Sequence, residues 1–264
     1  MAVAKKRFGQ HFLHDPGILR RLAAAVDVGA GETVLEIGPG PGGLTAELER
    51  TGARLIAIEK DRDLVPALRA RFPGAQIVEG DALDLDWHEL VGSGRFRIVG
   101  NIPYNITSPL LEQALTPPRP LVVVFLVQKE VAERIASAAG NGSYGALSVG
   151  VQVVARVERL FTVPAGAFRP RPKVDSAVVR LTPRPEPLLG DAEAGAFRRF
   201  VVGLFGFRRK QLGRGLRELT GAPPATVMDW LAEAGVGETA RPETLTPERF
   251  VKLFRIVQQH PDRR

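Results

Sequence analysis

The stretch Val34-Leu35-Glu36-Ile37-Gly38-Pro39-Gly40-Pro41-Gly42-Gly43 joins a short apolar run to a glycine-rich turn. The apolar run predicts a buried strand, and the glycines let the backbone come close to a ligand because they carry no Cβ. Four more apolar runs follow at 55–58, 76–78, 96–99 and 121–127, with segments of helical spacing between them. Strands that alternate with helices predict a parallel sheet covered by helices on both faces.

The first four runs each end in a glycine or a polar residue. These residues are Gly38, Glu59, Asp81 and Asn101, and they follow one another at steps of 21, 22 and 20. One strand-helix-strand unit has about this length, so all four residues should line the carboxyl edge of the sheet. Open α/β sheets bind their ligands at that edge.

The chemistry of this edge indicates which ligand it takes. The glycine stretch satisfies the G-x-G-x-x-G pattern, and Glu59 lies near the position expected to bind a ribose hydroxyl, so a dinucleotide oxidoreductase is one hypothesis. Glu36 precedes the glycines, however, and a carboxylate there would repel a pyrophosphate. Asp81 supplies a further acid where an adenine amino group would be bound. A cofactor with a ribose, an adenine and a cationic centre but no phosphates fits better, which favours S-adenosylmethionine.

The tetrapeptide Asn101-Ile102-Pro103-Tyr104 follows the fourth strand. It offers an amide, a carbonyl next to a fixed φ angle and an aromatic ring within four positions. An exocyclic amino group on a flat base needs such a set, because it presents two N–H bonds and a face for stacking. A simple turn after a strand is the alternative interpretation.

The second half of the chain changes character near residue 182. Two β-rich runs, 147–157 and 176–181, could close the sheet as an antiparallel edge. Proline and charge at 182–187 mark a linker. Beyond it, helical spacing covers 192–219, 225–234 and 247–259, where Thr246 supplies an N-cap. We therefore predict a domain over residues 1–186, with a basic arm at 1–13, and a small all-helical domain over 187–264.

Composition limits the class of partner and the compartment. The 264 residues carry a net charge of +7, which favours a polyanion such as nucleic acid. Cysteine is absent, so disulfides and thiolate sites are excluded, and no metal is expected. The charged N-terminus lacks the apolar core of a signal peptide, and no apolar run approaches eighteen residues. We expect a cytoplasmic protein without membrane contact.

Several motifs together resemble one family. They are Gly9-Gln10-His11-Phe12-Leu13, Leu35-Glu36-Ile37-Gly38-Pro39-Gly40, Ile58-Glu59-Lys60-Asp61, Gly80-Asp81-Ala82, Asn101-Ile102-Pro103-Tyr104, Gln128-Lys129-Glu130-Val131-Ala132 and the run from Phe168 through Pro170, Pro172, Lys173 and Asp175 to Leu181. In this order they are similar to the KsgA-type ribosomal RNA adenine N6,N6-dimethyltransferases. The resemblance covers residues 5–183 and extends more loosely through Phe207-Arg208-Arg209-Lys210-Gln211-Leu212.

The resemblance implies a fold, a reaction and roles for the matching residues. The fold would be a Rossmann-like seven-stranded S-adenosylmethionine-dependent methyltransferase sheet. The reaction would dimethylate N6 of two adjacent adenosines near the 3′ end of small-subunit (16S) rRNA and leave S-adenosylhomocysteine. The implied cofactor-binding residues are Gln10, His11, Leu13, Gly38, Gly40, Glu59, Lys60, Asp81, Ala82 and Asn101. His11 departs from the asparagine that is commoner in the family.

The implied reaction also assigns residues to the target base and to RNA. The Asn101 side chain and the Pro103 carbonyl would accept from N6, Tyr104 would stack on the base, and Phe168 would close its other face. Positive residues that could contact phosphates are Lys5, Lys6, Arg7, Arg169, Arg171, Lys173, Arg208, Arg209 and Lys210, with Arg214 and Arg217 nearby.

Two alternatives share this fold. One is a large-subunit (23S) rRNA adenine methyltransferase of the macrolide-resistance type. The run Lys173–Leu181 favours the small-subunit enzyme, because the resistance enzymes diverge there. The other is a non-catalytic transcription or assembly factor, which an intact Asn101-Ile102-Pro103-Tyr104 disfavours. We expect a monomer that works on the small ribosomal subunit and contributes to its assembly.

Overall fold

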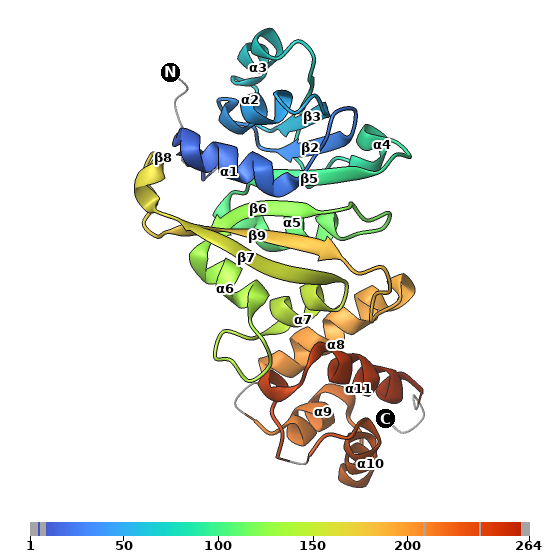
Figure 1. The fold of residues 1–264 in the computed structure, drawn as a ribbon. Coiled ribbons are helices and arrows are strands. Elements are labelled where there is room, and N and C mark those ends of the chain that lie inside the picture. The colour runs from blue at the N-terminus through green and yellow to red at the C-terminus, as the bar shows by residue number, and fades with distance from the viewer. Residues whose placement is uncertain (1–4, 6–8, 208–209, 238, 260–264) are drawn as a thin grey trace. The chain divides into compact units, whose positions relative to one another are not determined.

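A seven-stranded sheet forms the centre of the first part of the chain (Figure 1). The computed structural model describes residues 5, 9–207, 210–237 and 239–259. The strand order is β4-β3-β2-β5-β6-β9-β7. The strands are β2 (Thr33–Ile37), β3 (Arg54–Glu59), β4 (Gln76–Glu79), β5 (Phe96–Asn101), β6 (Val123–Gln128), β7 (Ala155–Val163) and β9 (Ser176–Pro183). Strands β2 to β6 pair in parallel, and β9 runs antiparallel to β6. The predicted Rossmann-like sheet is confirmed.

Helices connect the parallel strands and cover the sheet. They are α1 (Pro16–Val26), α2 (Gly43–Glu49), α3 (Val65–Arg71), α4 (Trp87–Val91), α5 (Thr107–Ala114) and α6 (Lys129–Ala136). Helix α1 begins at Asp15, whose carboxylate accepts from the Ile18 N–H at 2.9 Å. One turn apart on this helix, Leu22 and Val26 are fully buried in the cluster that contains Val124 of β6. Burying each such side chain contributes about 1.5–3 kcal/mol.

The N-terminal arm is tied to a distant segment by a second, two-stranded sheet. Strand β1 (Phe12–Leu13) pairs antiparallel with β8 (Phe168–Arg169), so that Leu13 lies opposite Phe168. The His14 N–H donates to the Ala167 carbonyl at 3.0 Å and extends this pairing. Gly9, Gln10 and His11, the residues just before β1, thereby lie at the carboxyl edge of the large sheet.

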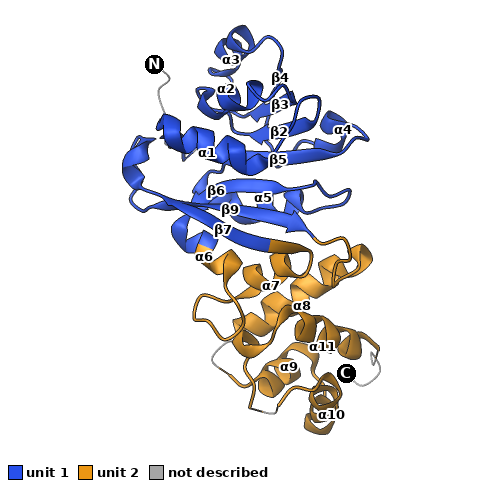
Figure 2. Ribbon diagram, viewed as in Figure 1, with its two compact units in different colours: residues 1–132, 157–183 blue, residues 133–156, 184–264 orange. Residues whose placement is uncertain are grey.

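The chain divides into two compact units, and their boundaries differ from the predicted domains (Figure 2). The first unit contains residues 1–132 and 157–183, and the second contains 133–156 and 184–264. The predicted boundary at 186 lies close to the change at 184. Residues 133–156, which the prediction placed in the first domain, belong to the second unit instead. Their apolar side chains, including Tyr144, Val149 and Val153, are buried in the core of that unit.

The predicted strand at 147–157 is mostly a helix. Helix α7 covers Ala146–Gln152, and β7 begins only at Ala155. Valines at every second position suggested a strand, but Val149 and Val153 also share one face at the helical spacing of four. The Ser148 hydroxyl accepts from the Gly145 N–H at 3.0 Å and helps the helix to begin there. Packing against the rest of the second unit decides between the two patterns.

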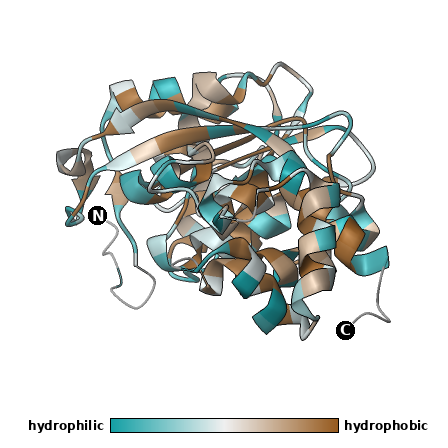
Figure 3. Cartoon of the chain, turned by 90° about the horizontal axis from the view of Figure 1, so that it is seen from below, coloured by the Kyte–Doolittle hydropathy of each residue, from teal (hydrophilic) through white to brown (hydrophobic). Residues whose placement is uncertain are grey.

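The second unit is helical after residue 184, as predicted. Its helices are α8 (Ala194–Gly206), α9 (Leu212–Thr220), α10 (Pro224–Ala234) and α11 (Pro247–Gln259). The single predicted helix at 192–219 is two helices, α8 and α9. Thr246 acts as the predicted N-cap, because its hydroxyl accepts from the Arg249 N–H at 3.4 Å. In Figure 3 many helices of the chain carry both hydrophobic and hydrophilic residues, as expected for helices with one buried and one exposed side. No helix among the described residues is long and apolar enough to cross a membrane.

Candidate active site

A pocket opens at the carboxyl edge of the parallel strands, in the first unit. Gly38, Glu59, Asp81 and Asn101 all line it, so the predicted register of the four strand ends is confirmed. Of the ten predicted cofactor-binding residues, nine line this pocket. The tenth, Leu13, lines a smaller hollow beside it, together with Glu36 and Pro39. The roles of these residues toward a cofactor remain predictions.

Glu59 is a buried carboxylate that the backbone holds in place. The Gly40 N–H donates to Oε2 at 2.9 Å and the Asp61 N–H donates to Oε1 at 2.7 Å. Burial raises the pKa of Glu59, and these backbone hydrogen bonds oppose the rise. Gly40 has a φ of +56°, and a Cβ there would lie 3.0 Å from the Phe12 ring. Only glycine therefore lets this turn reach Glu59 beneath the arm.

A second carboxyl group, that of Glu36, lies beneath the glycine turn and is almost fully buried. The Thr45 hydroxyl donates to Oε2 at 2.8 Å. Burial raises the pKa of Glu36 to about 8, although the hydrogen bond from Thr45 lowers it and the neighbouring Glu59 raises it further. A positive charge bound near the glycine turn would favour the ionised form of Glu36.

Asp81 follows β4 and makes an ion pair with Lys60. Its other oxygen accepts from the Leu83 N–H at 3.1 Å. Burial raises the pKa of Asp81, but the hydrogen bonds from Lys60 and Leu83 outweigh it and lower the pKa overall. The adjacent Ala82 is buried and lines the pocket. The carboxylate is therefore ionised and can accept a hydrogen bond from a ligand amino group at a remaining lone pair.

The Asn101 side chain is oriented by the N-terminal arm. Its Nδ2 donates to the His11 carbonyl at 2.8 Å. Because the amide nitrogen is used in this way, the amide oxygen is left to accept a hydrogen bond from a ligand in the pocket. Asn101 ends β5 and is half-buried. The predicted acceptor for an amino group is thus present at the predicted edge.

The second predicted acceptor, the Pro103 carbonyl, does not fit this structure. It accepts from the Ile106 N–H at 3.2 Å and from the Thr107 hydroxyl at 3.3 Å, because the chain turns into a short 3-10 helix at Tyr104–Ile106. The carbonyl before it, that of Ile102, receives no hydrogen bond within the described part of the chain, and Ile102 lines the pocket. The sequence could not distinguish these two carbonyls, because the difference depends on where the turn begins.

Tyr104 lies at the pocket wall with its hydroxyl fixed. Its Oη is 2.8 Å from the hydroxyl of Ser176, which is fully buried on β9. Burial raises the pKa of Tyr104 and the hydrogen bond with Ser176 partly offsets it, so the phenol is neutral. The His11 ring stacks on Tyr104 with ring centres 5.7 Å apart, and His11 Nδ1 is 2.7 Å from the Pro170 carbonyl. These two contacts fix the orientation of the His11 ring.

The predicted stacking role of Phe168 does not fit this structure. The ring is only 2% exposed and belongs to the core cluster of α1 and the sheet. Pairing of β8 with β1 turns Phe168 inward, beside Leu13. The ring therefore packs in the core, outside the residues that line the pocket.

Several pocket residues were not predicted from the sequence. Most are apolar or small and give the pocket its walls; they are Gly9, Phe12, Ile37, Ile58, Gly80, Ile102, Asn105 and Ile106. Ile37 and Ile58 immediately precede Gly38 and Glu59. Their position at the ends of two strands could have predicted that they line the pocket. Phe12 reaches the pocket through the β1–β8 pairing, for which the sequence carries no local signal.

The predicted RNA-contacting residues differ in their surroundings. Arg169, Arg171 and Lys173 are exposed around the β8–β9 loop, as are Arg214 and Arg217 on α9. Lys210 pairs with Glu218 at 3.6 Å. Lys5 does not fit the prediction, because its ammonium group is held between Asp61 and Asp63. Lys6, Arg7, Arg208 and Arg209 lie outside the described residues. No group of three or more metal-ligating side chains is found among the residues that the structure describes.

Comparison with known proteins places the whole chain in one group. The family model described as "Ribosomal RNA adenine dimethylase" matches residues 1–259. A protein of Pseudomonas aeruginosa named ribosomal RNA small subunit methyltransferase A is 43% identical, and the alignment covers 99% of this chain and 97% of that protein. Its namesake in Nitratidesulfovibrio vulgaris is 44% identical, with 96% of both chains covered.

Two solved structures are similar in fold over nearly the full length. A dimethyladenosine transferase from Plasmodium falciparum is 25% identical with a TM-score of 0.83, covering 96% of this chain and 98% of that one. The 23S rRNA methyltransferase ErmE is 31% identical with a TM-score of 0.72, covering 94% of this chain and 100% of that one.

Proposed function

Since the chain belongs to the ribosomal RNA adenine dimethylase family, we propose that it transfers methyl groups from S-adenosylmethionine to N6 of two adjacent adenosines in the 3′-terminal hairpin loop of 16S rRNA. The products would be N6,N6-dimethyladenosines and S-adenosylhomocysteine. The observation that carries the proposal is the Asn101 amide, whose nitrogen is bound to the His11 carbonyl so that its oxygen is available at the pocket.

The donor groups of the pocket fit S-adenosylmethionine. Glu59 is a buried acceptor for ribose hydroxyls, and Asp81 is an ionised acceptor for the adenine amino group. Gly38 and Gly40 leave space for the methionine end, and Glu36 beneath them would favour its positive charges. Gln10 and His11 line the pocket from the arm side, and Lys60 and Ala82 line the adenine side. When bound, the cofactor supplies an electrophilic methyl group.

The remaining residues would prepare the adenine nitrogen. N6 is a weak nucleophile because its lone pair is delocalised into the ring. Acceptance of its two N–H bonds by the Asn101 oxygen and the Ile102 carbonyl would orient N6 and favour a pyramidal nitrogen. The Tyr104 ring offers a stacking surface worth about 1–3 kcal/mol. Catalysis would then be positioning and electrostatics, because the proton becomes acidic only after transfer.

The base must leave its stack to reach this pocket. An adenosine in a loop is already unpaired and needs less energy to turn outward than one in a helix. For Tyr104 to stack on the base, the His11 ring must share the Tyr104 surface or move aside. Exposed Arg169, at the end of β8, and exposed Arg171 and Lys173 after it would contact phosphates near the entering base.

The small-subunit substrate is favoured over the large-subunit alternative. Relatives named as small subunit methyltransferases are more similar, at 43–44% identity, than the 23S enzyme, at 31%. A non-catalytic role is disfavoured, because the acceptors at the pocket are in place. We further propose that the protein acts in the cytoplasm on the small ribosomal subunit, as a monomer without membrane partners, and contributes to subunit assembly.

Methyl mapping tests the proposal. The purified protein receives labelled S-adenosylmethionine with small subunits that lack the modification and, separately, with large-subunit RNA. We expect label only in small-subunit RNA, on two adjacent adenosines of the 3′-terminal loop. Label in large-subunit RNA would support the resistance-type enzyme, and cofactor binding without transfer to either RNA would support the assembly factor.

A further inference from the structure

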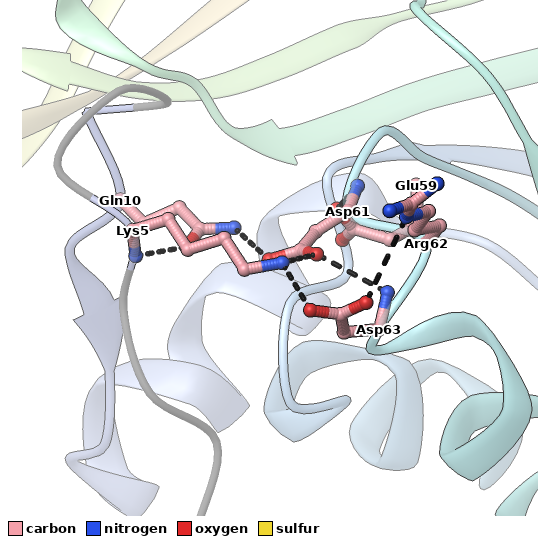
Figure 4. A network of polar contacts seen from close by, with 6 residues as sticks. All are labelled: Lys5, Gln10, Glu59, Asp61, Arg62 and Asp63. Atoms are coloured by element: carbon pink, nitrogen blue, oxygen red, sulfur yellow. Dashed lines mark hydrogen bonds and ion pairs between the residues drawn. The ribbon is translucent and has the colours of Figure 1, made fainter.

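A buried carboxylate lies next to the cofactor pocket without lining it. The Asp61 side chain is only 1% exposed, which is rare for an aspartate without partners. Its partners come from the N-terminal arm: the Lys5 ammonium pairs with Oδ1, and the Gln10 amide donates to Oδ2 at 3.3 Å (Figure 4). Burial raises the pKa of Asp61, but the hydrogen bonds from Lys5 and Gln10 contribute to a net lowering. The group is therefore an ionised anchor for the arm.

The same residue also holds the predicted ribose-binding carboxylate. The Asp61 N–H donates to Glu59 Oε1 at 2.7 Å. Asp61 further closes its own turn, because its Oδ1 accepts from the Asp63 N–H at 3.2 Å and its carbonyl accepts from the Leu64 N–H at 2.9 Å. One residue thus contacts the arm with its side chain and Glu59 with its backbone.

The arm carries the contact that orients Asn101. On one side, β1 fixes the arm to β8, starting at Phe12. On the other side, Gln10 and Lys5 fix it to Asp61, and the Lys5 N–H donates to the Gln10 side chain at 2.7 Å. His11 lies between these attachments, and its carbonyl accepts from Asn101 Nδ2. Release of the Asp61 side would leave the arm held only by β1 and by the contacts that His11 itself makes with Tyr104 and Pro170.

From this geometry we infer that Asp61 is a positioning residue for methyl transfer. It fastens the arm so that the His11 carbonyl holds the Asn101 amide in the accepting orientation, and it steadies Glu59 through its backbone. The inference rests on the proposed function. It predicts that loss of the Asp61 charge weakens cofactor binding and also slows the chemical step, although Asp61 touches neither cofactor nor base.

Asp61→Asn is the informative variant, because asparagine keeps an oxygen for the Asp63 N–H, removes the charge and replaces the oxygen that accepts from Gln10 with an amide nitrogen. We expect calorimetry with S-adenosylhomocysteine to show about tenfold weaker binding, as loss of a charge-assisted hydrogen bond predicts. We expect kcat on unmethylated small subunits to fall by about tenfold as well. Trypsin should cleave the arm at Lys5-Lys6-Arg7 faster than in the wild type, which reports on the arm without any turnover.

Variants of Lys5 break the contact between the arm and Asp61 without changing the turn that Asp61 forms with Asp63. Lys5→Met should show part of the loss of cofactor affinity and part of the loss of kcat. Lys5→Arg keeps the charge and should have nearly wild-type values of both. The effects of Lys5→Met and Asp61→Asn should be less than additive, because both break one ion pair.

Asp229→Asn, an exposed aspartate on α10, is the matched control and should behave like the wild type. The inference is overturned if Asp61→Asn keeps wild-type kcat, or if cofactor binding weakens while trypsin cleaves the arm at the wild-type rate. Failure of the proposed function would look different, because the wild-type protein itself would then transfer no methyl group to small subunits. In that case, trypsin cleavage and calorimetry would still show whether Asp61 holds the arm and supports binding of S-adenosylhomocysteine.

Discussion

At the scale of single residues, the site is built from polar side chains whose hydrogen-bond partners determine their orientation. The Asn101 amide is oriented by a backbone carbonyl, and Glu59 is oriented by two backbone N–H groups. Neither group depends on a flexible partner side chain, so both are preorganised for binding. Glu36 differs, because a single hydroxyl supports it in a buried environment.

Replacing Asn101 with alanine should nearly abolish transfer while leaving the cofactor bound. The variant removes an acceptor that acts on the target nitrogen, and we expect kcat to fall by about 10²–10³-fold. Calorimetry with S-adenosylhomocysteine should show only a small change. Asn141→Ala, at an exposed asparagine in the second unit, serves as the control. Wild-type turnover in Asn101→Ala would contradict the role.

Glu36 should make the free protein less stable as the pH rises. Its pKa is about 8 in the folded protein against an ordinary 4.5, so the folded state binds the extra proton between these values. Stability should therefore fall with rising pH across this window, by at most about 1.4 kcal/mol per unit from this group. Glu36→Gln keeps the Thr45 hydrogen bond and should flatten the decline. The measurement is denaturant unfolding of the wild type and Glu36→Gln at about pH 5, 7 and 8.5. If Glu36 were ionised throughout, the stability of both proteins would change with pH at the same slope.

At the scale of elements, the strands were predictable and the arm was not. Apolar runs with regular polar ends define β2 to β5 and the edge that holds Gly38, Glu59, Asp81 and Asn101, because each unit has nearly the same length. The β1–β8 pairing joins segments far apart in sequence and has no local pattern. Phe168 differs from its predicted surroundings because of this pairing, Pro103 because of where a turn begins, and Lys5 because of its ion pairs with Asp61 and Asp63.

Gly100, which precedes Asn101 in β5, should not tolerate a side chain. A Cβ there would lie 2.6 Å from the Ile37 backbone oxygen, and backbone cannot move aside as a side chain can. We expect Gly100→Ala to cost about 2 kcal/mol or more of unfolding free energy and to weaken cofactor binding. Gly94→Ala, where no atom lies within 4 Å of the added Cβ, is the matched control. If Gly100→Ala unfolded at the same midpoint temperature as the wild type, the predicted clash would be refuted.

At the scale of the whole molecule, the chain forms two units with separate cores. All residues of the pocket belong to the first unit. The second unit assembles from residues 133–156 and 184–264. A contact between these segments, from the Tyr144 hydroxyl to the Leu245 carbonyl at 2.9 Å, is fully buried. Composition marked the later boundary, near 184, but it gave no sign that an earlier segment joins the same core.

Removing the Tyr144 hydroxyl should destabilise the second unit and leave the pocket intact. Tyr144→Phe keeps the ring in the core but leaves the Leu245 carbonyl unpaired, which should cost about 1–3 kcal/mol. We expect a lower midpoint of unfolding and unchanged affinity for S-adenosylhomocysteine by calorimetry. A weakened affinity would show that the two units are energetically coupled.

The two-segment origin of the second unit governs how the protein can be shortened. A stop codon after residue 186 would delete α8 to α11 but keep α7 and the residue after it, so that Val149 and Val153 would lose the core in which they are buried. The shortened protein would carry an uncovered apolar surface, and such surfaces promote aggregation. A soluble catalytic fragment therefore requires excision of residues 133–156 as well, so the domain has to be cut from the gene in two places.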